Sequence, residues 1–173
     1  DSNTKCPSIV GQSTIPFIPM GAHGAGKDTA AWMEPDQILS FGRSQKVIPN
    51  KVVLQDYNWR TPTTVLLREA PVDSTAAFGT FYEFGDHYKT EAEGTTLAEI
   101  RAQEIKAGET VYNGTSTAKG LRAGHTVTVS KHPRTDFNVK YLLTEVRHRG
   151  AQPIEYVTAG AAGPVYQNDF TAI

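Results

Sequence analysis

Short segments in which hydrophobic and polar positions alternate recur along most of the chain. The clearest is HTVTVSK (125–131), where the two valines fall on one face and the hydroxyl residues on the other, the pattern of a half-buried strand. Apolar runs bounded by turn residues predict further strands. These lie at 46–59, 63–69, 78–84, 109–116 and 138–149, with short strands near 13–18 and 155–157 and connections at 70–76, 119–125 and 132–138.

One segment has the pattern of a helix, at about 91–107. Thr90 and Glu93 have the spacing of a capping box, and Gly108 supplies a stop after the last turn. Between them an apolar stripe is expected to pack on a sheet; it comprises Leu97, Ala98, Ile100, Ala102 and Ile105.

The number of strands predicts the fold class. Strands far outnumber helices, which favours a mainly β (α+β) fold: an antiparallel β-barrel-like domain with one packed α-helix. Pro- and Gly-rich residues 1–37 are expected to be an irregular connection, residues 38–150 the barrel, and residues 151–173 a linker or arm toward a next domain. The start at Asp1, without a Met, indicates a piece of a longer protein.

Composition and charge exclude several classes of protein. The net charge of -1 favours neither nucleic acid nor an anionic membrane as partner. No apolar run approaches membrane-spanning length. A single cysteine, Cys6, excludes an internal disulfide framework.

The segment GAHGAGKDT (21–29) has the spelling of a phosphate-binding loop. Gly21, Gly26 and Lys27 match G-x-x-x-x-G-K, in which backbone N–H groups surround a phosphate and the lysine neutralises it. Asp28, however, stands where the motif needs Ser or Thr. A nucleotide-binding enzyme is therefore the weaker alternative.

The neighbours of this loop also fit the motif poorly. Pro16 and Pro19 interrupt the strand that should precede it, and Pro35 ends any following helix after about two turns. We interpret 21–29 as a connection whose glycines serve turns.

No other segment predicts catalysis or a cofactor. The five histidines show no metal-ligand spacing, so no metal site is expected, and no G-x-S-x-G elbow is present. A hydrolase that cleaves cell-wall sugars would need a carboxylate pair in a cleft, and nothing among the 18 acids singles out such a pair. The sequence predicts a protein that is not an enzyme.

Three spaced motifs occur in a recognisable order between Ser40 and Gly150. The first is DYNWRTP (56–62), the second runs from YEFGDHY (82–88) to the Arg-bearing helix, and the third is GLRAGHTVTVSKHPRTDFNVKYLLTEVRHRG (120–150). In this order they resemble the VgrG family, the spike proteins of type VI secretion. The matching residues are Asp56, Tyr57, Arg60, Pro62, Tyr82, Gly94, Arg101, Leu121, Gly124, His132, Pro133, Asn138, Tyr141, Leu142, Val146 and His148.

This resemblance implies a structural hub related to tail-tube subunits, whose signature residues determine the fold rather than form a site. In the family three chains assemble as a homotrimer that sits on an Hcp-like tube and baseplate proteins. The hub carries the needle and, through regions outside this sequence, a spike tip protein and effectors. It is assembled in the bacterial cytoplasm and then secreted or injected. The baseplate hub of a phage or prophage tail has much of the same pattern and is the alternative.

Overall fold

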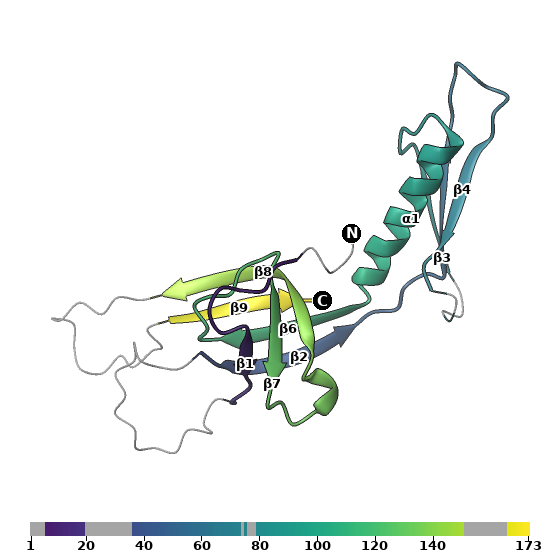
Figure 1. Cartoon of the computed structure of the whole chain (residues 1–173). Helices are drawn as coiled ribbons and strands as arrows, with labels where there is room; N and C mark the ends of the chain where they lie inside the picture. The colour runs from purple at the N-terminus through teal and green to yellow at the C-terminus, as the bar shows by residue number, and fades with distance from the viewer. Residues whose placement is uncertain (1–5, 20–35, 74, 76–78, 151–165) are drawn as a thin grey trace, which may run out of the picture. The chain divides into compact units, whose positions relative to one another are not determined.

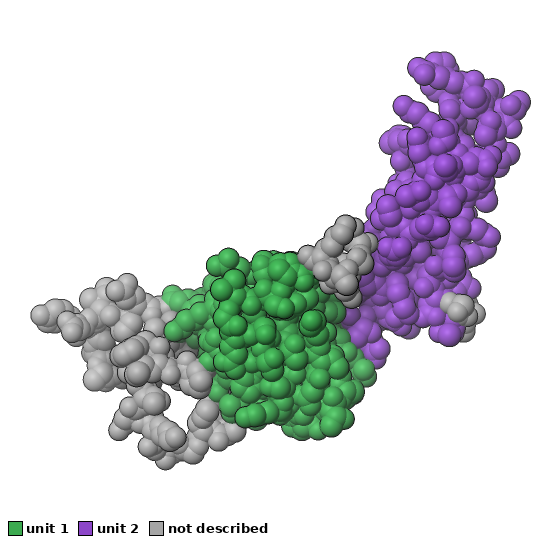
Figure 2. Space-filling model, viewed as in Figure 1, with its two compact units in different colours: residues 1–44, 111–173 green, residues 45–110 purple. Residues whose placement is uncertain are grey.

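The computed structural model describes residues 6–19, 36–73, 75, 79–150 and 166–173. The chain divides into two compact units (Figure 1, Figure 2): unit 1 consists of residues 1–44 and 111–173, and unit 2 of residues 45–110. Unit 2 is thus an insertion in the chain of unit 1. The predicted division at residues 37 and 150 stays a prediction.

Unit 1 is built on one six-stranded sheet that curls strongly (Figure 1). The strand order is β1 (Thr14–Pro16), β7 (Thr126–Ser130), β8 (Lys140–Gly150), β9 (Tyr166–Ala172), β6 (Thr110–Ser116) and β2 (Ile38–Gln45). The two edges approach each other, because Phe17 after β1 forms a bridge with Ile38 and the Ile18 N–H donates to the Ile38 carbonyl at 2.8 Å. The curl therefore brings the edge strands together at one corner.

The inner side of this sheet holds the core of unit 1. Alternation in β7 turns Val127 and Val129 inward, as the sequence predicted, and each is 1% exposed. They pack in one cluster with Leu143, Tyr141 and Phe170. The remaining buried members of the cluster are Ile9, Ile15, Ile38, Ala118, Leu121 and Ala172.

Two strands of unit 1 differ from the sequence-based expectation. The edge strand β2 was not predicted, since four of its eight residues, Gly42–Gln45, are exposed in succession and show no alternation. Residues 166–172 were expected in a linker, yet β9 lies between β8 and β6 and pairs antiparallel with both. Only pairing on both sides makes this polar segment a central strand.

Unit 2 is a three-stranded sheet with a helix on one face. The strand order is β4 (Leu66–Pro71), β3 (Lys51–Asp56) and β5 (Thr80–Phe84), and the helix is α1 (Glu91–Ala107). Helix α1 contacts β3 and β4. The mainly β fold with one packed helix is confirmed, but the helix covers this small sheet. The pairs β3–β5 and β1–β7 are parallel, so the sheets are mixed rather than purely antiparallel.

The capping box that predicted α1 is formed. The Glu93 N–H donates to the Thr90 hydroxyl at 3.3 Å, and the Glu93 carboxylate accepts from the N–H groups of Lys89 (2.9 Å) and Thr90 (3.3 Å). The hydrogen bond from the Lys89 N–H is the main cause that lowers the pKa of Glu93. Gly108 caps the other end of the helix.

The buried stripe of α1 consists of small residues, Gly94, Ala98 and Ala102. Ile100 was expected in this stripe but is 53% exposed, because two residues after Ala98 a helix has turned by about 200°. That expectation was wrong.

Tyr88 fixes the distance between α1 and the sheet. Its hydroxyl donates toward the carbonyl oxygens of Leu66 (2.6 Å) and Leu54 (3.1 Å), which belong to neighbouring strands. Its ring lies against Gly94, where an added Cβ would come within 2.5 Å of a ring carbon. The hydrogen bonds hold the ring in place, so only glycine fits at position 94.

Because Gly94 lies against Tyr88, replacing this glycine by alanine is expected to change stability in the direction opposite to that given by helix propensity. Alanine inside a helix is normally more stable than glycine by about 1 kcal/mol. We expect Gly94→Ala instead to lower the free energy of unfolding by about 1–3 kcal/mol, as overpacking does. Urea unfolding followed by circular dichroism at the helix band measures this change. Thr95→Ala, at an exposed position of the same helix, is the control, and a Gly94→Ala chain more stable than wild type would contradict the packing.

Candidate functional site

Large apolar side chains that remain exposed gather in unit 2. Among the residues that the structure describes, nine of the twelve large apolar side chains that are exposed lie within residues 45–110, although unit 2 is the smaller unit. Single exposed apolar residues are ordinary, whereas a concentration of them marks an interaction surface. Unit 2 therefore carries the stronger candidate for a contact surface.

The main part of this concentration is the side of the small sheet opposite α1. Because Val52 and Leu54 are buried beneath the helix, the alternate residues Val53 and Gln55 face away. Their cross-strand partners on that side include Leu67, Tyr82 and Phe84, which are 39%, 55% and 60% exposed. We call these five residues, Val53, Gln55, Leu67, Tyr82 and Phe84, the aromatic sheet face.

The aromatic sheet face is ordered by its own contacts. The Tyr82 hydroxyl donates to Gln55 Oε1 at 2.8 Å, and Lys51 pairs with Glu69 at 2.8 Å at one end of the strands. The tyrosine ring therefore presents a fixed apolar surface with a polar tip, a combination enriched in interfaces.

The connection between β3 and β4 extends the exposed apolar surface beyond the strand ends. Tyr57, Trp59 and Val65 are 60%, 73% and 71% exposed. The Arg60 guanidinium lies 5.0 Å from the centre of the Trp59 ring, within cation–π range. Since β3 and β5 run parallel, this connection and Phe84 lie at the same end of the sheet.

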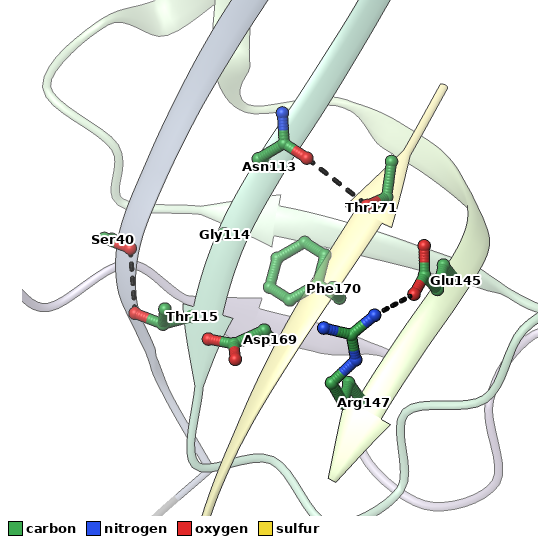
Figure 3. Close-up of a pocket in the computed structure, with 9 residues that line it drawn as sticks. All are labelled: Ser40, Asn113, Gly114, Thr115, Glu145, Arg147, Asp169, Phe170 and Thr171. Atoms are coloured by element: carbon green, nitrogen blue, oxygen red, sulfur yellow. Dashed lines mark hydrogen bonds and ion pairs between the residues drawn. The ribbon is translucent and has the colours of Figure 1, made fainter.

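A different surface, a polar groove of about 360 Å³, lies on unit 1 across β2, β6, β9 and β8 (Figure 3). Its charges are neutralised internally: Arg147 pairs with Glu145 at 2.9 Å and Arg149 with Asp169 at 2.7 Å. Ser40 and Thr115 hydrogen-bond to each other at 2.8 Å. The groove has no excess charge to attract a ligand of one sign.

Signature residues of the first motif and the helix lie in unit 2, and some of them are exposed. Tyr57, Arg60 and Pro62 are exposed in the β3–β4 connection. One oxygen of Asp56 accepts the Tyr57 N–H at 2.7 Å, and the other is buried without a hydrogen-bond partner among the described residues. Together with Tyr82, these residues shape the aromatic end of the small sheet.

Arg101, the signature residue on the helix, is the centre of an ion-pair cluster. Its guanidinium lies 3.1 Å from Glu104 and 3.6 Å from Asp86. The hydrogen bond with Glu104, and then the charge of Asp86, raise the pKa of Arg101. The pair with Asp86 links α1 to the segment after β5, whereas the pair with Glu104 lies within the helix.

Signature residues of the third motif shape unit 1 from within. Leu121 is 1% exposed, and Val146 packs against the same core. Gly124 has φ +77°, a conformation that favours glycine, and its N–H donates to the Leu143 carbonyl at 2.8 Å. Leu142 is half-buried on β8 and its N–H donates to Ile173 at 2.9 Å.

His132 and Asn138 hold the turn before β8. Asn138 Oδ1 accepts the His132 N–H at 2.8 Å, and Asn138 Nδ2 donates to the His132 carbonyl at 3.0 Å. Asn138 has φ -84°, whereas Lys131, just before the turn, has φ +61°. Pro133 lies exposed inside the turn.

Two further signature residues carry polar groups that are satisfied locally. Tyr141 is 3% exposed and its hydroxyl donates to the Phe137 carbonyl at 3.0 Å. His148 is exposed, and its Nδ1 lies 2.5 Å from the Tyr166 hydroxyl. The structure thus distributes the signature residues over two units and brings no catalytic group together among them.

Two of the segments predicted as strands divide between surface and core. The FGTFYEF segment (78–84) contributes Tyr82 and Phe84 to the surface, whereas KYLLTEV (140–146) buries Tyr141 and Leu143 in the core. The sequence did not indicate that Leu67 and Val53 contribute to this surface. Alternation along β3 and β4 was the available signal, but it could be used only once it was known that a helix covers one face of the sheet.

Three further expectations from the sequence concern the loop at 21–29, metal ligands and membrane-spanning segments. The loop at 21–29 lies outside the described residues. Within the described part of the chain, no three His, Cys, Asp or Glu residues are grouped as metal ligands. A search of the same residues finds no helix of sufficient length and apolarity to cross a bilayer.

Comparisons with known proteins agree with the arrangement of strands and motifs. The family described as phage tail baseplate hub (GPD) matches residues 1–154. The type VI secretion system spike protein VgrG1a of Pseudomonas aeruginosa is 24% identical over 165 residues, which are 94% of this chain and 24% of that protein. VgrG1c of the same bacterium is 23% identical over 168 residues, 96% of this chain and 22% of that protein. The chain therefore spans about a quarter of the length of these relatives.

Two solved structures have a similar fold. A 43 kDa prophage tail protein from Shewanella oneidensis superposes with a TM-score of 0.61 at 8% identity, over 96% of this chain and 44% of that one. A tail protein from Neisseria meningitidis gives a TM-score of 0.59 at 10% identity, over 92% and 43%. At these identities the likeness concerns the fold alone.

The buried hydroxyl of Tyr141 predicts a loss of stability at alkaline pH. Burial raises the pKa of Tyr141 from 10.0 to about 12, so the folded state holds this proton more tightly than the unfolded state. The contribution of this protonated hydroxyl to the free energy of unfolding is complete below about pH 10 and is lost as the pH rises toward about 12. Tyr141→Phe is expected to reduce this alkaline loss, as measured by urea unfolding at pH values on both sides of the window. If the free energy of unfolding of Tyr141→Phe fell with pH as steeply as that of the wild type, the prediction would be contradicted. The control is Tyr166→Phe, at a less buried tyrosine.

Proposed function

Because the chain belongs to the phage tail baseplate hub (GPD) family, we propose that it is the structural hub component of a trimeric cell-puncturing spike in a type VI secretion apparatus. At the coarser level, the chain is a baseplate hub or VgrG-like spike domain of a contractile injection system. The family is structural rather than enzymatic. The secretion assignment is supported by the spike proteins that match 94% and 96% of the chain.

The proposed partners follow from this role. Three copies form the hub, which docks on an Hcp-like tube and contacts baseplate proteins. Regions beyond this chain carry the spike tip protein and the effectors. The hub is assembled in the bacterial cytoplasm and then leaves the cell with the needle.

The aromatic sheet face is the structural observation that supports this proposal. A helix covers one side of the small sheet, while the other side exposes Leu67, Tyr82 and Phe84. A sheet with an exposed apolar side is typical of a domain that buries this side in an assembly. We propose that this face contacts the tube or the baseplate.

The signature residues are proposed to act through the fold. Gly94 and Leu121 set packing, while Gly124, His132 and Asn138 shape turns. Tyr57, Arg60 and Tyr82 are exposed members whose side chains lie on the small sheet of unit 2 or on its β3–β4 connection. Of the signature residues, we therefore expect substitutions at these three to impair assembly without unfolding the chain.

The hub of a phage or prophage tail is the second candidate, since the matching family is described by that role. The two candidates predict different tubes. An experiment with both kinds of tube separates them.

The proposed docking is tested by binding to purified tube proteins. The chain is mixed with the Hcp-like protein of the bacterium that encodes it and, separately, with the tail-tube protein of a prophage in the same genome. We expect a complex with the Hcp-like tube in sedimentation velocity. Because central aromatic residues dominate interface energies, the double variant Tyr82→Ser, Phe84→Ser is expected to weaken binding by at least about tenfold.

The control replaces another exposed apolar residue, outside unit 2. Val10, 79% exposed on unit 1, is changed to Ser and should leave binding intact. Binding only to the prophage tube would transfer the assignment to the phage alternative. Binding to neither would refute the proposed docking.

A further inference from the structure

The outer side of α1 carries a shallow groove that the aromatic sheet face does not include. This helix groove, of about 530 Å³, lies between α1 and the segment after β5. Its apolar part comes from Tyr88, Ala92, Leu97 and Ile100, and its acidic part from Asp86 and Glu93. Ile100, 53% exposed, is an apolar residue on a solvent-facing helix surface and is not among the residues packed against the core of unit 2.

The helix groove has an excess of negative charge. Glu93 accepts backbone N–H groups at the helix start and forms no ion pair with a described cation. Asp86 has one buried oxygen without a hydrogen-bond partner among the described residues. The residues that line the groove include these two acids and no Lys or Arg. Outside the lining, Arg101 is shared between Asp86 and Glu104, and the charge of Lys89 contributes to lowering the pKa of Glu93. Unit 2 as a whole contains ten Asp and Glu residues against seven Lys and Arg.

Unit 1 presents a surface of opposite charge. The turn between β7 and β8 carries Lys131, Arg134 and Lys140, with Asp136 as the one acid in the stretch 131–140. Arg134 pairs with Asp136 at 2.6 Å and lies 4.3 Å from the centre of the Phe137 ring. Lys131 and Lys140 form no ion pair with a described residue.

The same surface has an apolar centre. Val139, between these cations in sequence, is 46% exposed, and Arg43 of β2 lies 5.9 Å from the Phe137 ring. We call residues 131–140 the basic turn. Asn138 and His132 hold its backbone through two hydrogen bonds, so its shape is fixed before any partner binds. Unit 1 contains ten Lys and Arg residues against eight Asp and Glu.

We propose that the basic turn of one copy of the chain docks in the helix groove of a second copy. Val139 of the first copy would pack on Leu97 and Ile100 of the second. Lys131 and Lys140 would face the acids of the groove, Asp86 and Glu93. The occupant is chosen by complementarity: two patches on one chain have opposite charge, and each has an exposed aliphatic residue at its centre.

A contact between two different patches has a consequence for assembly. It joins copies head to tail, and such contacts close into a ring when the rotation between copies permits. This inference rests on the proposed self-assembling hub and specifies which surfaces join its copies. The aromatic sheet face then remains free for the tube.

Two substitutions test the contact by placing a charge at the exposed aliphatic residue of each patch. Ile100→Arg places a cation in the groove, and Val139→Glu places an anion in the turn. Each single variant is expected to weaken self-association by at least about tenfold in sedimentation velocity at low ionic strength. A mixture of the two, or the double variant, is expected to restore association because the introduced charges attract each other. Wild-type association should weaken as salt is added.

The control is Val10→Glu, which adds a charge at an exposed valine of unit 1 outside both patches and should not change association. Circular dichroism verifies that every variant is folded. Single variants that associate like wild type, or a mixture that fails to associate, would overturn this contact while leaving the hub role intact. A wild-type chain that is monomeric even at about 1 mM would also overturn it. The tube-binding assay judges the hub role independently.

Discussion

The close approach of Tyr88 to Gly94 is the contact on which the arrangement of unit 2 depends. The tyrosine hydroxyl lies on carbonyl groups of two neighbouring strands, and its ring occupies the space where any side chain at position 94 would lie. The buried residues of α1 are accordingly small, and the helix lies close to β3 and β4. With one side of a three-stranded sheet covered in this way, the opposite side exposes its alternate residues. The aromatic sheet face is thus a direct result of how the helix packs, and the ring of Tyr88 also forms part of the helix groove.

Unit 1 uses a comparable contact in its curled sheet. Gly114 of β6 lies opposite Phe170 of β9, and an added Cβ would come within 2.6 Å of the Phe170 ring. The ring thereby reaches the inner core with Phe41 and Tyr141. The polar groove on the same sheet has balanced charges, because Arg147 pairs with Glu145 and Arg149 with Asp169. The proposed partner surface of unit 1 is the basic turn, which connects β7 and β8 of this sheet.

These features describe a protein that works through its surfaces. The described residues contain no grouped metal ligands, and the family to which the chain belongs is structural. Most signature residues set packing or turns, so substitutions there would act through folding. Exposed aromatic residues and unneutralised charges are the groups that can act on other molecules, and they lie outside the buried positions that preserve the fold.

The features that the sequence determined alone are those with local causes. Thr90 and Glu93 specify the helix start within four residues, and the alternation in 125–131 specifies a half-buried strand. The spaced motifs indicated the family and its structural role, although they left open whether the chain belongs to a secretion spike or to a phage tail. Tertiary structure decided the rest, because these features depend on partners distant in sequence. β9 becomes a central strand only through β6 and β8, and Ile100, Tyr82 and Phe84 become surface residues only because α1 turns its small residues toward β3 and β4. Hydrophobic residues show in the sequence that they can be buried, whereas the packing of strands and helix decides which of them are.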